Sequence, residues 1–139
     1  MASQVQTARP GGRGRTVGWV LCGIVIAFLL MDATMKLLAL EVVTDASVQL
    51  GYHGDAATAR LLGVLLLACT LLYAAPPTAV LGAILLTGYL GGAIASHVRV
   101  GDPLFTHDLF GVYLGVFLWL GLYLRDARLR ALVPLRRAA

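Results

Sequence analysis

The chain is predominantly apolar for 22 residues between Val17 and about Leu38. Because a helix rises about 1.5 Å per residue, a run of this length crosses a hydrocarbon core of roughly 30 Å. Only 13% of the residues are charged, whereas soluble domains carry about 25%. The sequence therefore predicts an all-α fold, a four-helix transmembrane bundle that forms one domain in the lipid bilayer. Its expected spans are residues 17–38, 56–74, 78–96 and 108–124.

The segment before the first span, residues 1–16, is polar and rich in Gly and Arg, and we expect a disordered cytoplasmic arm. Its Arg9, Arg13 and Arg15 are typical of the basic start of a signal peptide. However, the apolar run that follows is long enough to span a membrane, and no A-x-A cleavage pattern comes after it. We therefore expect this run to be a retained first helix.

The first polar loop, residues 39–55, is long enough for a short amphipathic helix on the membrane surface. One face of that helix would carry Val42, Val43, Ala46 and Leu50, and the other Glu41, Asp45 and Gln49. Residues 75–77 form a tight, uncharged turn, and residues 97–107 form the second polar loop.

Positive charge is concentrated at the two ends of the chain, and this predicts an orientation. Four spans place both ends on one side, and positively charged ends remain in the cytoplasm. We therefore expect an N-in/C-in, multi-pass protein of the inner membrane, with both termini cytoplasmic and both polar loops outside. Eight of the 11 Lys and Arg residues lie at the ends, namely Arg9, Arg13, Arg15, Arg125, Arg128, Arg130, Arg136 and Arg137.

The basic tail, residues 125–139, allows two interpretations. It is a solvated cytoplasmic signal, or it lies on the membrane with Leu129, Leu132 and Leu135 toward lipid. No basic patch interleaved with aromatic residues lies inside the apolar region, so nucleic acid is not an expected partner.

Small residues recur at four-residue spacing on the third and fourth spans, a pattern that lets membrane helices approach closely. We therefore expect these two spans to pack together through their glycines. Gly92→Leu should then be more damaging than a substitution of Gly82 or Gly121. The glycines of the two G-x-x-x-G patterns are Gly88, Gly92, Gly111 and Gly115.

Several ionisable residues are expected to meet at the outer ends of the spans. Asp32 and Lys36 are four residues apart, so they share one face of the first helix. A charge in hydrocarbon is costly and normally finds a partner. We expect Asp32 to be ionised and held by Lys36 plus at least one of Arg60, Arg99 or His97. The full expected cluster is Asp32, Lys36, Arg60, His97, Arg99, His107 and Asp108, with Tyr89 and Ser96 lining a pocket beside it.

Purely structural roles for these residues remain open. The long cationic side chains can extend to the interface, and Asp32 can simply neutralise them. His97 and His107 could ligate haem or a metal, but further ligands at set spacing are missing, so no metal site is predicted. No cofactor motif is evident. Cys22 and Cys69 lie in apolar runs without a C-x-x-C pattern, and we expect free thiols, although a disulfide is conceivable.

Four stretches resemble the DoxX-like family of small bacterial membrane proteins: FLLMDATMKLL, LGYHGD, LGAILLTGYLGGAIASHVRVGDP and GVFLWLGLYLRDARLRALVPLRR. The similarity extends from about Val17 to Arg137, and its most specific part is 88–103. The family usually has Pro after L-G-Y, where this chain has His53. The resemblance implies a link to quinone-coupled oxidation of thiosulfate or to oxidant defence, although many members have no established activity.

Three functions are therefore considered. The first, which the resemblance implies, is a membrane subunit of a redox complex. This subunit would bind quinone and would have the other subunits of the complex as partners. The second is a non-enzymatic scaffold or partner-docking protein, since no cofactor motif is present. The third is a small proton-coupled carrier with Asp32 as the titrating group, which four short spans without an internal repeat disfavour. A homo-oligomer is compatible with all three.

Overall fold

The computed structural model describes residues 12–103 and 109–132, and within these ranges its regular structure is entirely helical. This agrees with the all-α fold that the sequence predicts. The elements are α1 (Gly12–Leu37), α2 (Glu41–Gln49), α3 (Ala56–Ala74), the short 3-10 helix η1 (Pro76–Thr78), α4 (Ala79–Val100), α5 (Leu109–Arg125) and α6 (Ala127–Leu132).

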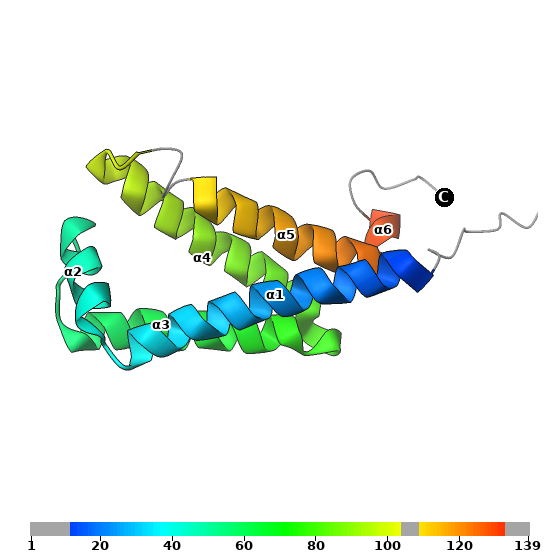
Figure 1. Ribbon diagram of the computed structural model, residues 1–139, viewed down its shortest axis with the longest axis horizontal. Coiled ribbons are helices and arrows are strands. Elements are labelled where there is room, and N and C mark those ends of the chain that lie inside the picture. Colours follow the sequence, from blue (N-terminus) through cyan, green and yellow to red (C-terminus); the bar gives the residue numbers. More distant parts are fainter. Residues whose placement is uncertain (1–11, 104–108, 133–139) are drawn as a thin grey trace, which may run out of the picture.

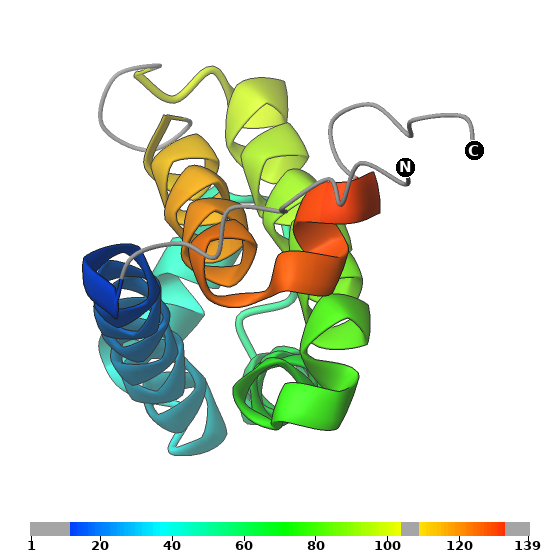
Figure 2. The ribbon, with the colours of Figure 1, turned by 90° about the vertical axis from the view of Figure 1, so that its right-hand side faces the viewer.

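The four long helices pack side by side, as the view along their axes shows (Figure 2). α1 contacts α3 and α5, and α4 contacts the same two helices from the other side. α2 lies at one end of the molecule, whereas α6 and the start of α1 lie together at the opposite end (Figure 1). The basic residues at the two ends of the described chain therefore share one end of the fold.

Helix lengths follow from where the chain can turn. α3 covers residues 56–74, the same range as the second expected span, and ends before Pro76 and Pro77. α4 continues one turn beyond the expected end at Ser96, because nothing in the next four residues breaks a helix. It stops at Gly101, whose φ of 77° is a left-handed conformation that glycine adopts without a steric penalty.

The outer surface of the helices is apolar, as expected for a membrane protein. Large side chains such as Ile24 (61% exposed) and Leu61 (69% exposed) point away from the core. Three helical segments are long and apolar enough to cross a membrane: Gly12–Leu37, Ala56–Ala74 and Pro76–Val100. α5 is apolar but shorter, with 17 residues.

The closest helix contacts are made at glycines other than the expected ones. A Cβ atom on Gly18 of α1 would lie 2.8 Å from the carbonyl oxygen of Gly121 on α5. A Cβ atom on Gly82 of α4 would lie 2.2 Å from the backbone nitrogen of Tyr73. Only a residue without a side chain permits backbones to approach this closely. Substitutions of Gly82 and Gly121 are therefore not the mild ones, contrary to the sequence-based expectation.

The expectation that Gly88 and Gly92 pack against the fourth span is wrong. A Cβ atom at either position would meet nothing within 4 Å. The other pattern does face α4, since a Cβ atom on Gly111 would lie 2.9 Å from Ile94 Cγ1, but at Gly115 the nearest atom is 4.0 Å away. The row of small residues on α4 thus borders open space rather than a helix.

The start of the C-terminal tail packs against the bundle. Leu129 of α6 is only 4% exposed and belongs to the hydrophobic core, so the interpretation that it faces lipid is wrong. The Arg130 guanidinium donates to the carbonyl oxygens of Tyr123 and Leu124, both at 3.0 Å. These bonds cap carbonyl groups that the end of α5 leaves without helical partners.

Candidate functional site

A cavity of about 650 Å³ lies where the α1–α3 pair separates from the α4–α5 pair. The two pairs diverge toward the end that carries α2 (Figure 1), and residues of α2 contribute to the wall there. We refer to this space as the capped cavity. It is a product of the whole fold, since all five of these helices line it. Its volume is typical of a site for a small molecule.

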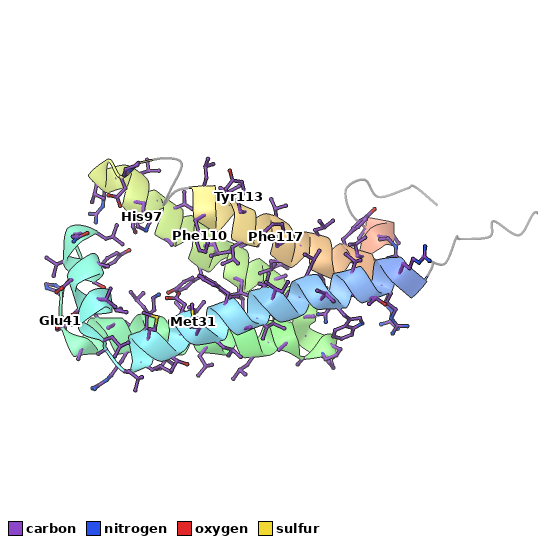
Figure 3. The ribbon with its side chains drawn as sticks, in the orientation of Figure 1. Met31, Glu41, His97, Phe110, Tyr113 and Phe117 are labelled. Atoms are coloured by element: carbon purple, nitrogen blue, oxygen red, sulfur yellow. The ribbon has the colours of Figure 1, made fainter. Side chains whose placement is uncertain are left out.

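The deeper walls of the capped cavity are apolar. Phe28 and Phe110 line it from α1 and α5, and their rings meet edge to face with centroids 5.1 Å apart. Figure 3 shows Phe110 at the start of α5, on the side that faces α1. Leu29, Leu65, Leu90 and Leu114 complete much of this surface. Gly88 and Gly92 also line it, so the small residues of α4 make room for the cavity.

The polar part of the cavity wall contains an ion pair on α1. Lys36 Nζ donates to Asp32 Oδ1, and both side chains are partly buried, at 18% and 31% exposed respectively. Both residues line the capped cavity. The four-residue spacing that the sequence shows does bring these two groups together. A partly buried pair of this kind places one positive and one negative charge beside an otherwise apolar space.

A second polar group in the wall joins the loop after α2 to α4. The Tyr52 hydroxyl lies 2.7 Å from Ser96 Oγ, and Ser96 Oγ donates to the Gly92 carbonyl oxygen at 2.9 Å. Because a serine hydroxyl has one hydrogen, Tyr52 is the donor to Ser96. Tyr89 also lines the cavity, and within the described residues its hydroxyl has no hydrogen-bond partner. Tyr52 is a site residue that sequence analysis missed.

Two of the other predicted cluster residues, Arg60 and Arg99, do not converge on Asp32, whereas His97 lines the same cavity. Arg60 Nε donates to the Leu37 carbonyl oxygen at 3.3 Å, and Arg99 Nη2 donates to that of Leu50. Both guanidinium groups thus bind backbone at the ends of helices. The prediction that Arg60 or Arg99 also holds Asp32 is therefore wrong.

His97 has an acidic partner of its own. Its Nδ1 lies 2.6 Å from Asp102 Oδ2, and Figure 3 shows His97 toward the same end of the molecule as Glu41 of α2. In the described part of the chain the salt bridges are this one and Asp32–Lys36. His107 and Asp108 lie outside the described residues. Within residues 12–103 and 109–132, no group of three or more His, Cys, Asp or Glu side chains could hold a metal ion.

Both cysteines are free thiols with different surroundings. Cys69 on α3 is 5% exposed and lines the capped cavity. Cys22 on α1 is fully buried, 3.1 Å from the Tyr73 hydroxyl, which donates to the Leu118 carbonyl oxygen at 2.8 Å. The position of Cys69 in the cavity wall could have been predicted from the sequence, because Leu62, Leu65 and Cys69 recur on one face of α3.

A second concave surface, the α4–α5 groove, has a volume of about 600 Å³ and is almost wholly apolar. Gly91, Ile94, Gly115 and Leu120 line it. Its polar feature is a hydrogen bond between the two helices, from Trp119 Nε1 to Thr87 Oγ1 at 2.8 Å.

The comparisons with known proteins give one match. The model of the DoxX-like family matches residues 20–121, which covers most of α1, all of α2 to α4 and most of α5. No curated protein and no solved structure matches the chain. The match includes every residue described above as lining the capped cavity. Because it extends over well more than half of the sequence, the chain belongs to the DoxX-like family.

Proposed function

We propose that this DoxX-like protein is a membrane subunit of a redox complex and binds a quinone-class molecule in the capped cavity. The observation that carries the proposal is the shape of the site, a 650 Å³ space with apolar walls and a few convergent polar groups. Aromatic and aliphatic walls suit a ring and an isoprenoid tail. Lys36 and Tyr89 supply N–H and O–H donors for the ring oxygens.

The proposed setting is the inner membrane, with α5 as a fourth span and both termini in the cytoplasm. Seventeen residues of helix rise about 25 Å, a little less than a hydrocarbon core, and such a mismatch costs only fractions of a kcal/mol per Å. The shared location of α6 and the start of α1 supports this orientation, because Arg13, Arg125 and Arg128 then lie together on the cytoplasmic side.

The proposal is tested by purifying the protein from native membranes, extracting its lipids and recording the ultraviolet and visible spectrum before and after reduction. We expect a quinone in stoichiometric amount.

In parallel, Asp32→Asn and His97→Ala are compared with the wild type for folded yield and for rescue of oxidant sensitivity in a deletion strain. Loss of rescue at normal yield is expected for Asp32→Asn. Full rescue by both variants, with no quinone extracted, would leave a scaffold as the function.

The α4–α5 groove favours that second candidate, docking of a helix from a partner subunit. Gly91 and Gly115 leave its floor without side chains, which suits close helix approach in a membrane. Gly91→Leu should then release the partner in cross-linking experiments while the capped cavity stays intact. Gly92→Leu, at the neighbouring position, should keep the partner bound and fill part of the capped cavity.

A further inference from the structure

The ion pair in the capped cavity leaves one acceptor atom available. Lys36 binds Asp32 Oδ1, and within the described residues Asp32 Oδ2 has no hydrogen-bond partner. An ionised carboxylate accepts hydrogen bonds and cannot donate them. A ligand head group that meets Oδ2 must therefore carry a hydrogen-bond donor. Across the cavity on α4, the Tyr89 hydroxyl can serve as donor or acceptor.

We infer that the head group recognised by this site carries a hydroxyl, as in an amphipathic phenol or the reduced form of a quinone. This inference rests on the proposed function and specifies its ligand. A phenolic hydroxyl can donate to Asp32 and accept from Lys36 or Tyr89, whereas an oxidised ring oxygen can only accept. The site therefore prefers the hydroxyl form of the head group over forms that lack the donor.

The same ion pair discriminates against charged head groups. An anion or a cation in the cavity would meet both charges of the pair, so repulsion by one largely cancels attraction by the other, and the cost of removing the charged group from water stays uncompensated. The pair as a whole is neutral, so an uncharged polar head group meets no such penalty. The apolar walls from Phe28 to Leu114 accept the tail.

The test compares two ligands that differ only in the donor, 4-dodecylphenol and 4-dodecylanisole, with a short-chain quinone as third ligand. Dissociation constants are obtained from the dependence of the melting temperature on ligand concentration, for protein in lipid nanodiscs. We expect the phenol to bind at least roughly tenfold more tightly than the anisole, the range for a hydrogen bond to a charged group. In the double variant Asp32→Leu/Lys36→Met, which leaves no unpaired charge, the ratio should fall below about threefold.

The outcomes separate this inference from the proposed function. Equal binding of phenol and anisole to the wild type, with the quinone also bound, overturns the hydroxyl preference and leaves the quinone site standing. Binding of none of the three ligands overturns both. If the double variant does not fold, Asp32→Asn provides the second comparison, and the phenol should again lose more affinity than the anisole, because a neutral amide oxygen is a weaker acceptor than a carboxylate.

A separate set of contacts concerns access to the cavity. The segment that follows α2 is tied to α4 by two hydrogen bonds, Tyr52 to Ser96 and Arg99 to the Leu50 carbonyl oxygen. Gly51 makes the second one sterically feasible. Its φ is 76°, and a Cβ atom there would lie 2.9 Å from Arg99 Nη2. α2 itself contacts α3, and Val43 and Ala46 form part of the cavity wall.

We propose that α2 with residues 50–54 is a hinged cover, and that these two hydrogen bonds hold it closed over the capped cavity. The test needs no ligand, because Cys69 reports access to the cavity and the fully buried Cys22 reports general loosening. Alkylation of both thiols by N-ethylmaleimide is followed by mass spectrometry. Gly51→Ala and Tyr52→Phe should each accelerate modification of Cys69 severalfold and leave Cys22 unchanged.

The control variant is Tyr113→Phe, which alters a tyrosine on the outer face of α5 that is 53% exposed. It should leave both rates at the wild-type value. An unchanged Cys69 rate in both Gly51→Ala and Tyr52→Phe would overturn the cover. An equal rise for Cys22 and Cys69 would also overturn it, because the whole bundle would then have loosened.

Discussion

Tyr73 connects three helices through one hydroxyl group. It lies on α3, donates to the Leu118 carbonyl oxygen on α5 and accepts a hydrogen bond from the Cys22 thiol on α1. Tyr73 and Cys22 are fully buried, so neither polar group has water as an alternative partner. A buried network with its donors satisfied helps to specify how neighbouring helices are aligned.

Tyr73→Phe should therefore lower the free energy of unfolding by about 1–3 kcal/mol, because it leaves the Cys22 thiol without its acceptor in an apolar core. The matched control is Tyr113→Phe, which removes a hydroxyl from the exterior. Both are measured by denaturant or thermal unfolding in the same detergent. Equal stabilities of the two variants would show that the Tyr73 network contributes nothing.

For individual side chains, the sequence predicts contacts within a helix better than contacts between elements. The Asp32–Lys36 pair follows from four-residue spacing. The partners of Arg60 and Arg99 do not, because these are carbonyl groups at the end of α1 and after α2. Where such backbone groups lie depends on how the loops close, and no spacing rule encodes that.

Among the elements, α1 and α5 cross closely along their length. A Cβ atom on Gly121 would lie 2.9 Å from Cys22 Sγ and 3.2 Å from the Gly18 carbonyl oxygen. Gly121→Ala should destabilise the fold by about 1–3 kcal/mol through overpacking. Gly23→Ala, on α1, should be neutral or slightly stabilising, since a Cβ atom there meets nothing within 4 Å and alanine favours helix. Melting temperatures in detergent check both, and a stable Gly121→Ala would contradict the close crossing.

The helices themselves follow from apolar run lengths, and the short helix predicted in the first loop is present as α2. What the small residues on α4 border cannot be predicted from the sequence. Four-residue spacing identifies a face without side chains, but the same face can border a helix or a cavity. Here Gly88 and Gly92 border the cavity because α4 diverges from α1, an arrangement that depends on all the other helices.

For the whole molecule, the sequence predicts that polar residues from different helices gather at one end, and this is only partly realised. Asp32, Lys36, Ser96 and Tyr89 do line one cavity. Arg60 and Arg99 stabilise helix ends near it. The cavity itself arises from the divergence of two helix pairs and the position of α2 over them, which no local pattern specifies.

The proposed orientation makes a prediction at this scale. A reporter enzyme that is active only outside the cytoplasm should be silent when fused after residue 139 and active when inserted between Gly51 and Gly54. The same reporter fused after Ala75, at the opposite end of α3, should be silent. Activity of the C-terminal fusion would reverse the proposed topology.

The central claim is that the capped cavity holds a ligand, and the glycines of α4 allow it to be filled by a side chain. Gly92→Leu projects into the cavity, whereas Gly91→Leu projects into the α4–α5 groove, and a Cβ atom at either position meets nothing within 4 Å. Both variants should fold as stably as the wild type. The deciding measurement is the amount of quinone that co-purifies with each protein. We expect the wild-type amount with Gly91→Leu and a loss of at least roughly tenfold with Gly92→Leu, equivalent to about 1.4 kcal/mol of binding free energy. An undiminished amount of quinone with a folded Gly92→Leu variant would contradict the claim.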